Sequence, residues 1–255
     1  SAAQIVASLL SRPSIPLWRQ VMNRPASHSF EIYLLGQTIY FYVTTAQENQ
    51  PFIESLVASA YPKAQITRTT DPMEGIFGSK RIEAGEMVLN SYFYLPINTY
   101  FDFKDVDALA PLVGFLSRQG PETRAAVQII VTPASFAWQK KASKAMTIQS
   151  YDTTSDRYSP NPQRILVERK TSFQGGRAII RLVAATDGES TRPTLQNLAG
   201  TFGNFSLGGG NQFVFKRPLI GKAGFWKKIR DRRITLLERR LQILNAQELA
   251  TIWHP

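Results

Sequence analysis

Short β-prone runs joined by tight turns constrain the fold of this chain most strongly. The stretch SFEIYLLGQTIYFYVTT holds two runs rich in β-branched and aromatic residues, 30–35 and 38–44, with only Gly36-Gln37 between them. A two-residue connection that contains glycine is typical of a tight β-hairpin. A predicted helix that Pro62 ends follows, and AQITRT, 64–69, is then predicted as a third strand. The order β-β-α-β indicates an antiparallel α+β unit.

A similar order of elements is predicted further along the chain. Apolar spacing and turn residues predict four elements there: a strand over 164–171, a strand over 177–185 after Gly175-Gly176, a helix over about 191–205, and a strand over 211–216. Between the two halves, the sequence predicts a β-prone segment over 85–100, a helix led by acidic residues, a buried strand over 125–132 and a basic helix. We therefore expect an α+β fold with two β-β-α-β (ferredoxin-like) halves, mainly antiparallel sheets and a C-terminal basic helix. The halves form either two small domains or one larger sheet.

The polar stretch YDTTSDRYSPNPQ, residues 151–163, is the strongest candidate for a subdomain boundary or a mobile loop. The expected organisation has four parts. These are a Pro-punctuated, membrane-proximal lead-in over 1–27, a first α+β subdomain over 28–150, a second over 151–242, and a connector over 243–255.

The composition excludes several kinds of site. The 255 residues include no cysteine and two histidines, so disulfides, thiolate metal sites and cysteine nucleophiles are ruled out, and a histidine-rich metal site is not expected. No apolar run in the sequence approaches the roughly 20 residues that cross a bilayer as a helix.

The formal net charge of +11 is concentrated near the C-terminus. Between Lys216 and Arg240 there are ten basic residues against Asp231 and Glu238, with aromatic residues interleaved. Such a surface attracts a polyanion. We therefore predict a nucleic-acid or anionic-surface site made of Lys216, Arg217, Lys222, Trp226, Lys227, Lys228, Arg230, Arg232, Arg233, Arg239 and Arg240. DNA contact, apposition to anionic lipid and a merely solvated cationic face remain three open interpretations of this segment.

The sequence carries no enzyme signature. The stretch RPLIGKAGFWKK lacks the glycine spacing and the Ser/Thr of a P-loop, and no G-x-S-x-G elbow occurs. The carboxylates Asp102, Asp105 and Asp107 are explained by capping at a helix start, although a catalytic or metal role is the alternative. The sequence predicts no catalytic residue, no metal site and no cofactor site.

The chain closes on ILNAQELATIWHP, in which Asn245 is predicted to cap a short helix that His254-Pro255 ends. Together with SFEIYLLGQTIYFYV, IESLVASAYPKAQI, YLPINTYFDFKDVDALAPLVGFLS and GPETRAAVQIIVTP, this closing block resembles the N-terminal region of conjugative-transfer and type IV secretion ATPases of the FtsK/HerA superfamily. The likeness covers most of residues 28–255 and rests on the order of the blocks.

The resemblance implies a non-catalytic accessory domain that acts in ring assembly, channel docking or DNA guidance. It implies that the connector leads into a motor domain, to which ATP and magnesium belong, and that the domain lies in the cytoplasm at the inner face of a bacterial cell membrane. The implied partners are that ATPase domain, secretion-channel or relaxosome proteins, DNA or an anionic membrane surface, and further copies of the chain in an oligomer. The alternatives are a stand-alone assembly or membrane-apposed module without DNA binding, and a self-contained enzyme.

Overall fold

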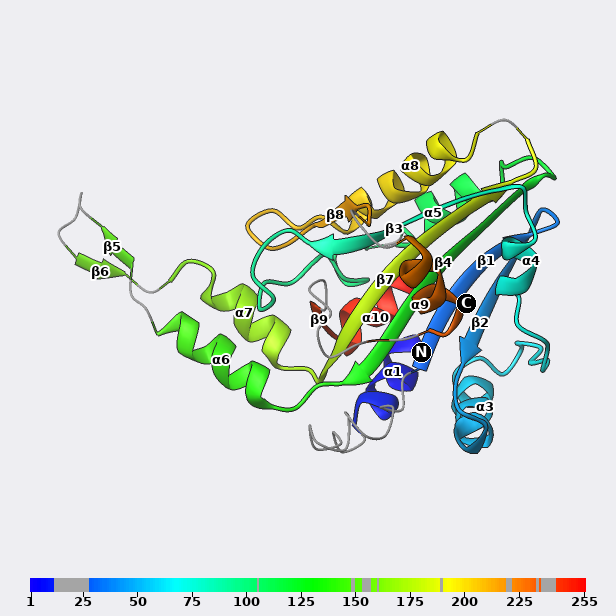
Figure 1. Cartoon of the computed structure of the whole chain (residues 1–255). Coiled ribbons are helices and arrows are strands. Elements are labelled where there is room, and N and C mark those ends of the chain that lie inside the picture. The colour runs from blue at the N-terminus through cyan, green and yellow to red at the C-terminus, as the bar shows by residue number, and fades with distance from the viewer. Residues whose placement is uncertain are drawn as a thin grey trace.

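A seven-stranded sheet organises the computed structural model of this chain (Figure 1). The structure describes residues 1–11, 28–104, 106–147, 150–152, 157–159, 161–188, 190–218, 222–232, 234 and 242–255. The strand order is β2-β1-β4-β7-β3-β8, and β9 also pairs with β7. Every pairing is antiparallel. The strands are β1 (His28–Leu35), β2 (Thr38–Thr44), β3 (Arg81–Leu89), β4 (Thr123–Pro133), β7 (Gly175–Thr186), β8 (Phe213–Lys216) and β9 (Gln242–Asn245).

The two longest strands, β4 and β7, form the centre of the sheet and pair from Thr123↔Thr186 to Pro133↔Gly176. The other side of β7 is shared, because β3 pairs with its second half and β9 with its first four residues. The side chain of Gln242 closes the junction between these two strands. Its amide oxygen accepts from the Leu89 N–H at 2.6 Å and its amide nitrogen donates to the Met87 carbonyl at 3.1 Å.

Helices cover both faces of the sheet (Figure 1). The main core lies on one face, where alternate strand residues such as Phe30, Ile129 and Ile180 meet apolar helix residues. The elements on that face are α1 (Ala2–Leu10), α3 (Gln50–Ala60) with its preceding 3-10 turn η1 (Gln47–Asn49), α5 (Ala110–Leu116), α8 (Arg192–Gly200), η2 (Thr201–Phe205) and α10 (Ala246–Ile252). On the opposite face, α4 (Met73–Phe77) and α9 (Lys222–Arg230) pack over a smaller core.

The connection between β4 and β7 is an arm that projects away from the sheet (Figure 1). It consists of α6 (Ala137–Met146), a small hairpin of β5 (Ser150–Asp152) and β6 (Arg157–Ser159), and α7 (Arg164–Thr171). The two helices lie side by side, with the hairpin at the outer end. The described residues of the predicted boundary over 151–163 thus fall in the outer part of the arm.

The α+β class is confirmed, and strands from both sides of residue 150 share the one sheet. The hairpin at Gly36-Gln37 is also confirmed, with both turn residues at positive φ, 54° and 64°. The predicted helix over 191–205 is present as α8 and η2. The predicted cap at Asn245 is confirmed, because its side chain accepts from the Glu248 N–H while the Glu248 carboxylate accepts from the Asn245 N–H.

Two predicted strands were wrong. Residues 64–69 form no strand and are exposed, because β1 already has β2 and β4 as neighbours and the segment carries polar residues such as Gln65 and Arg68. Residues 164–171 form the helix α7 instead. There an Arg164–Glu168 ion pair at i,i+4 supports the helix, and Val167 and Lys170 share its buried face at i,i+3. The β-prone segment 85–100 remains a strand only to Leu89.

Among the helices described here, none is long and apolar enough to cross a membrane.

Gly175 provides a test of the packing at the base of the arm. A Cβ at this position would lie 2.7 Å from Cζ2 of Trp138, whose ring is buried against the glycine. We expect Gly175→Ala to lower the free energy of unfolding by about 1–3 kcal/mol, because the side chains and backbone must shift to relieve the overlap. Urea denaturation measures this change.

Gly114 is the matched control, because it lies inside α5 with open space around its Cα. Gly114→Ala should raise the free energy of unfolding by roughly 0.5–1 kcal/mol through the better helix propensity of alanine. Equal effects of the two substitutions would contradict the packing described at Gly175.

Candidate functional site: a buried polar row beneath the basic helix

A row of polar side chains crosses the sheet beneath α9. Strand register places Tyr42, Glu31, Gln128, Arg181, Glu86 and Lys216 at successive positions on β2, β1, β4, β7, β3 and β8. The four central members, from Glu31 to Glu86, are buried. Burying such groups is costly unless each is hydrogen-bonded or paired. The row therefore requires partners, and the helix above it supplies several of them.

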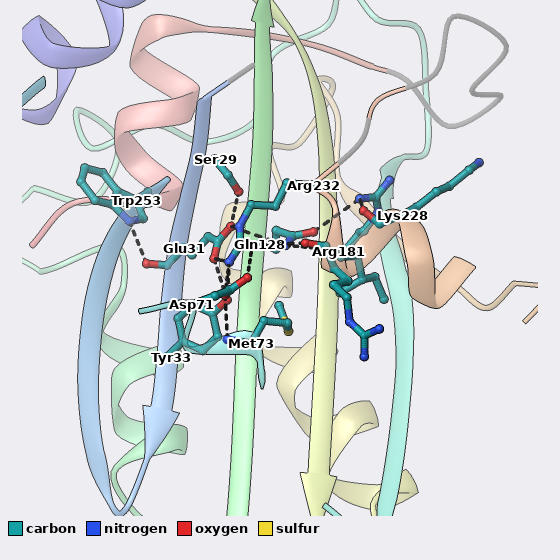
Figure 2. A network of polar contacts seen from close by, with 12 residues as sticks. Ser29, Glu31, Tyr33, Asp71, Met73, Gln128, Arg181, Lys228, Arg232 and Trp253 are labelled. Atoms are coloured by element: carbon teal, nitrogen blue, oxygen red, sulfur yellow. Dashed lines mark hydrogen bonds and ion pairs between the residues drawn. The ribbon is translucent and has the colours of Figure 1, made fainter. Parts of the chain in front are cut away.

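The end of α9 binds to this row through its backbone (Figure 2). Arg181 donates to the Lys228 carbonyl at 2.9 Å, and the Gln128 amide donates to the Ile229 carbonyl at 3.1 Å. The last carbonyls of a helix have no partner within the helix and carry its negative dipole end, so a guanidinium and an amide are suitable caps. Phe225 and Ile229 add apolar contact with the sheet. The polar row thus fixes where α9 ends.

Arg232 anchors the chain just after α9 (Figure 2). Its guanidinium donates to both carboxylate oxygens of Glu31, at 2.6 and 3.0 Å, and to both of Asp71, at 2.7 and 2.8 Å. Such paired contacts are the strongest form of an Arg–carboxylate interaction. The backbone of Arg232 has a φ of 50°, which is unfavourable for a residue with a side chain. The strain at this position is offset by the fit of the guanidinium between the two acids.

We define the acidic socket as Glu31, Tyr33 and Asp71. Hydrogen bonds from two hydroxyls and one backbone N–H hold its carboxylates in place. The Tyr33 hydroxyl donates to Glu31 at 2.6 Å, the Ser29 hydroxyl donates to the same carboxylate, and the Met73 N–H donates to Asp71 at 2.9 Å. Because Met73 begins α4, the socket ties β1, α4 and the end of α9 together.

The charges in the socket shift its titrations. Burial opposes ionisation of Asp71, but the hydrogen bonds from Arg232 and from the Met73 N–H outweigh it and hold the pKa of the carboxyl below its usual range. Burial and then the neighbouring Glu31 raise the pKa of the Tyr33 hydroxyl, which stays protonated and donating. Burial lowers the pKa of Arg232, but the bonds to Asp71 and Glu31 prevail and raise it above its ordinary value.

Several residues of the predicted basic site have partners within the chain, and Lys216, Lys227 and Arg230 are exposed. Arg217 pairs with Glu83 at 3.2 Å, and Arg230 pairs with Glu74 at 3.4 Å while its guanidinium lies 4.5 Å from the centre of the Phe77 ring. Trp226 packs edge-on against that same ring. Arg232 occupies the socket, and Lys216 continues the polar row.

The remaining predicted residues divide into two groups. Lys227 is exposed, while Lys228 is half-buried and offers its carbonyl to Arg181. The side chain of Lys222 and the whole of Arg233, Arg239 and Arg240 lie outside the described residues. That these eleven residues bind an anionic partner stays a prediction. In the described part, Arg217, Arg230 and Arg232 already have carboxylates from within the chain.

Sequence reasoning missed the partners in the sheet, Glu31, Gln128, Arg181 and Glu86, and also Asp71. A usable signal existed, because Glu31, Gln128 and Arg181 each interrupt an otherwise apolar strand run. Of the acidic cluster noted above, Asp107 accepts from the Leu109 N–H just before α5 and Asp102 pairs with Arg169, so capping and pairing account for both; Asp105 lies outside the described residues.

The chain belongs to the family DUF8128, described as a domain of unknown function, whose model matches residues 2–254. No curated protein matches the sequence. Within the residues described, no group of three or more His, Asp or Glu side chains is arranged to hold a metal ion.

Removing Arg232 tests the role of the socket. Arg232→Ala leaves Glu31 buried without its cation, so we expect the free energy of unfolding to fall by about 3–5 kcal/mol. Arg68→Ala is the control, because it breaks a similar short pair with Glu54 at a surface where Arg68 is 69% exposed. That change should cost about 1 kcal/mol or less. Equal losses in urea denaturation would contradict a buried anchoring role for Arg232.

The depressed pKa of Asp71 predicts a pH dependence. A carboxyl whose pKa is lowered by folding adds stability above its unfolded pKa and loses it as the pH falls through the folded pKa. The stability difference between the wild type and Asp71→Asn should therefore be largest near neutral pH and should shrink as the pH falls below about 4. Thermal unfolding from pH 7 to pH 3 measures it, and a constant difference would contradict the ion pair with Arg232.

Proposed function

We propose that this chain is a non-catalytic accessory domain of a conjugative DNA-transfer or type IV secretion motor, and that it acts in assembly and docking. The proposal rests on the order of sequence blocks that resembles the N-terminal region of FtsK/HerA-type motors. Its place would be cytoplasmic, at the inner face of a bacterial cell membrane, with the motor's ATPase domain and channel or relaxosome proteins as partners. ATP and magnesium would belong to the motor domain.

The observation that best supports docking is the projecting arm. Two large apolar side chains on it lie in solvent, Phe136 at 68% and Ile165 at 77% exposed. Apolar side chains presented on an element that leaves the body of a domain favour contact with another protein.

The arm is firmly joined to the C-terminal helix, which supports a role in transmitting contact. Lys170 of α7 and Glu248 of α10 form an ion pair at 3.1 Å with both side chains fully buried. The Asn245 amide, at the cap of α10, donates to the Lys170 carbonyl at 3.0 Å. All seven residues of α10 are buried. A force or displacement at the arm would therefore reach the C-terminal helix through a rigid polar contact.

Nucleic-acid contact is the second candidate, and the exposed lysines of α6 favour it. Lys140, Lys141 and Lys144 are all exposed on a helix without an acidic residue. Such a face neutralises phosphates without sequence readout. Lys227 on α9 is a further exposed cation from the predicted basic site.

Competition in cells tests the docking proposal. Donor cells that carry the parent motor and an excess of this domain should transfer DNA at least tenfold less often, because the free domain occupies the docking sites. Phe136→Ser with Ile165→Ser should relieve this inhibition, since the exposed apolar contacts are lost while the fold is untouched. Mating frequency is the measurement.

Val106→Ser is the control for that pair, because Val106 is 63% exposed but lies outside the arm. It should inhibit transfer as strongly as the wild-type domain. Relief by the control, or no inhibition by the wild-type domain at matched expression, would count against docking through the arm.

Fluorescence anisotropy with a labelled DNA duplex tests the second candidate. Lys140→Ala with Lys141→Ala and Lys144→Ala should weaken binding and lower the slope of log K against log salt by about 2–3 if these lysines contact phosphates. A triple alanine variant of the exposed Lys63, Lys80 and Lys104 removes the same charge elsewhere. Equal losses in both triple variants, or no binding by the wild type at low salt, would exclude a specific role for α6.

A further inference from the structure

The strand β2 forms one edge of the sheet and has no charged residue, proline or bulge, three of the devices that guard an edge. Within the described part of the chain it pairs only with β1, and Figure 1 shows it at the margin of the sheet. Proteins normally guard such edges with charged residues, proline or a bulge. The sequence TIYFYVT of Thr38–Thr44 contains no charged residue and no proline. Its seven residues are all β-branched or aromatic, which are the types that favour strand pairing.

The hairpin geometry fixes which backbone groups point outward. Leu35 and Thr38 are paired on either side of a two-residue turn. In that arrangement Thr38 and every second residue after it bond to β1. The alternate residues Ile39, Phe41 and Val43 therefore direct their N–H and C=O groups away from the sheet, as a ready template for another strand.

The residue sequence of β2 is nearly palindromic. About Phe41 as the centre, Tyr40 matches Tyr42, Ile39 is balanced by Val43, and Thr38 by Thr44. An interface between two identical chains on a two-fold axis requires such self-complementarity, because each residue meets the position related to it by the axis. Antiparallel pairing centred on Phe41 would place Ile39 opposite Val43 of the partner subunit and would form six backbone hydrogen bonds.

Charge also favours a second copy at this edge. The chain carries a net charge of +11, yet no charged residue occurs from Ile32 to Gln47. Two copies therefore approach at this edge without placing like charges opposite each other. On the α9 face of the sheet, Tyr40 is 43% exposed, and its ring contacts that of Tyr42 with a centroid distance of 6.1 Å. Pairing would cover both rings with those of the second copy.

We propose that β2 is an interface between two copies of this chain, joined antiparallel about a two-fold axis at Phe41 so that two sheets become one. The proposal is independent of the motor function proposed above, because a two-fold contact is not a ring contact and needs neither DNA nor an ATPase.

Disulfide trapping tests both the interface and its register. The sequence has no cysteine, so every disulfide reports on introduced residues alone. The proposed register places position 40 opposite position 42 of the second copy, within the range of Cα separations that a disulfide spans. A mixture of Tyr40→Cys and Tyr42→Cys proteins should form a cross-linked dimer on mild oxidation, visible by non-reducing electrophoresis. Each variant alone should remain largely uncross-linked.

Sedimentation of the unmodified chain provides the second measurement. A monomer–dimer equilibrium is expected, and Tyr40→Lys should raise the dimer dissociation constant at least tenfold by placing a charge on the edge. Lys63→Ala, at another exposed position, should leave it unchanged. A monomer at every concentration, which would leave the edge to a strand of a different protein, overturns the proposal. Cross-linking of the single variants as strong as that of the mixture overturns the register.

Discussion

The buried ion pairs are the constraint on which the rest of this structure depends. Arg181, Lys170, Glu31 and Glu248 are fully buried, and a charge without water must be paired and hydrogen-bonded. Each of these groups joins segments that are far apart in the sequence: Glu31 meets Arg232, Lys170 meets Glu248, and Arg181 donates to the Lys228 carbonyl. Because such a pair fails if either partner moves, the positions of α9, α7 and α10 on the sheet are specified together.

These buried contacts also give the basic segment a structural role. On charge alone, residues 216–240 are typical of a polyanion-binding surface. In the fold, sheet and α4 carboxylates bind Arg217, Arg230 and Arg232, and the row beneath α9 binds its last carbonyls. Arg232 is largely withdrawn from solvent, with 11% of its side chain exposed, whereas Arg217 and Arg230 keep 36% and 53% of theirs exposed.

What the sequence predicts well is local in origin. The turn at Gly36-Gln37 and the cap at Asn245 depend on neighbouring residues, and both are present in the fold. The strand predicted over 164–171 was wrong because its β-branched residues were weighed without the Arg164–Glu168 pair that supports a helix.

The polar row across the sheet could not be predicted from local sequence patterns. Whether Glu31 meets Gln128 and Gln128 meets Arg181 depends on the register of three strands, and register is decided by partners a hundred residues away. The acids that pair with Arg217, Arg230 and Arg232 are equally remote, at positions 31, 71, 74 and 83. A count of charges along the chain therefore cannot distinguish a binding surface from a docked helix.

The most direct test of a docked α9 is hydrogen exchange of its backbone amides in the native protein. If the helix is held by the polar row and the socket, the amides of Ile229, Arg230 and Arg232 should exchange slowly, with protection approaching that of β4 and β7. Exchange of these amides at nearly the rate of an unstructured peptide, while the central strands stay protected, would contradict the account.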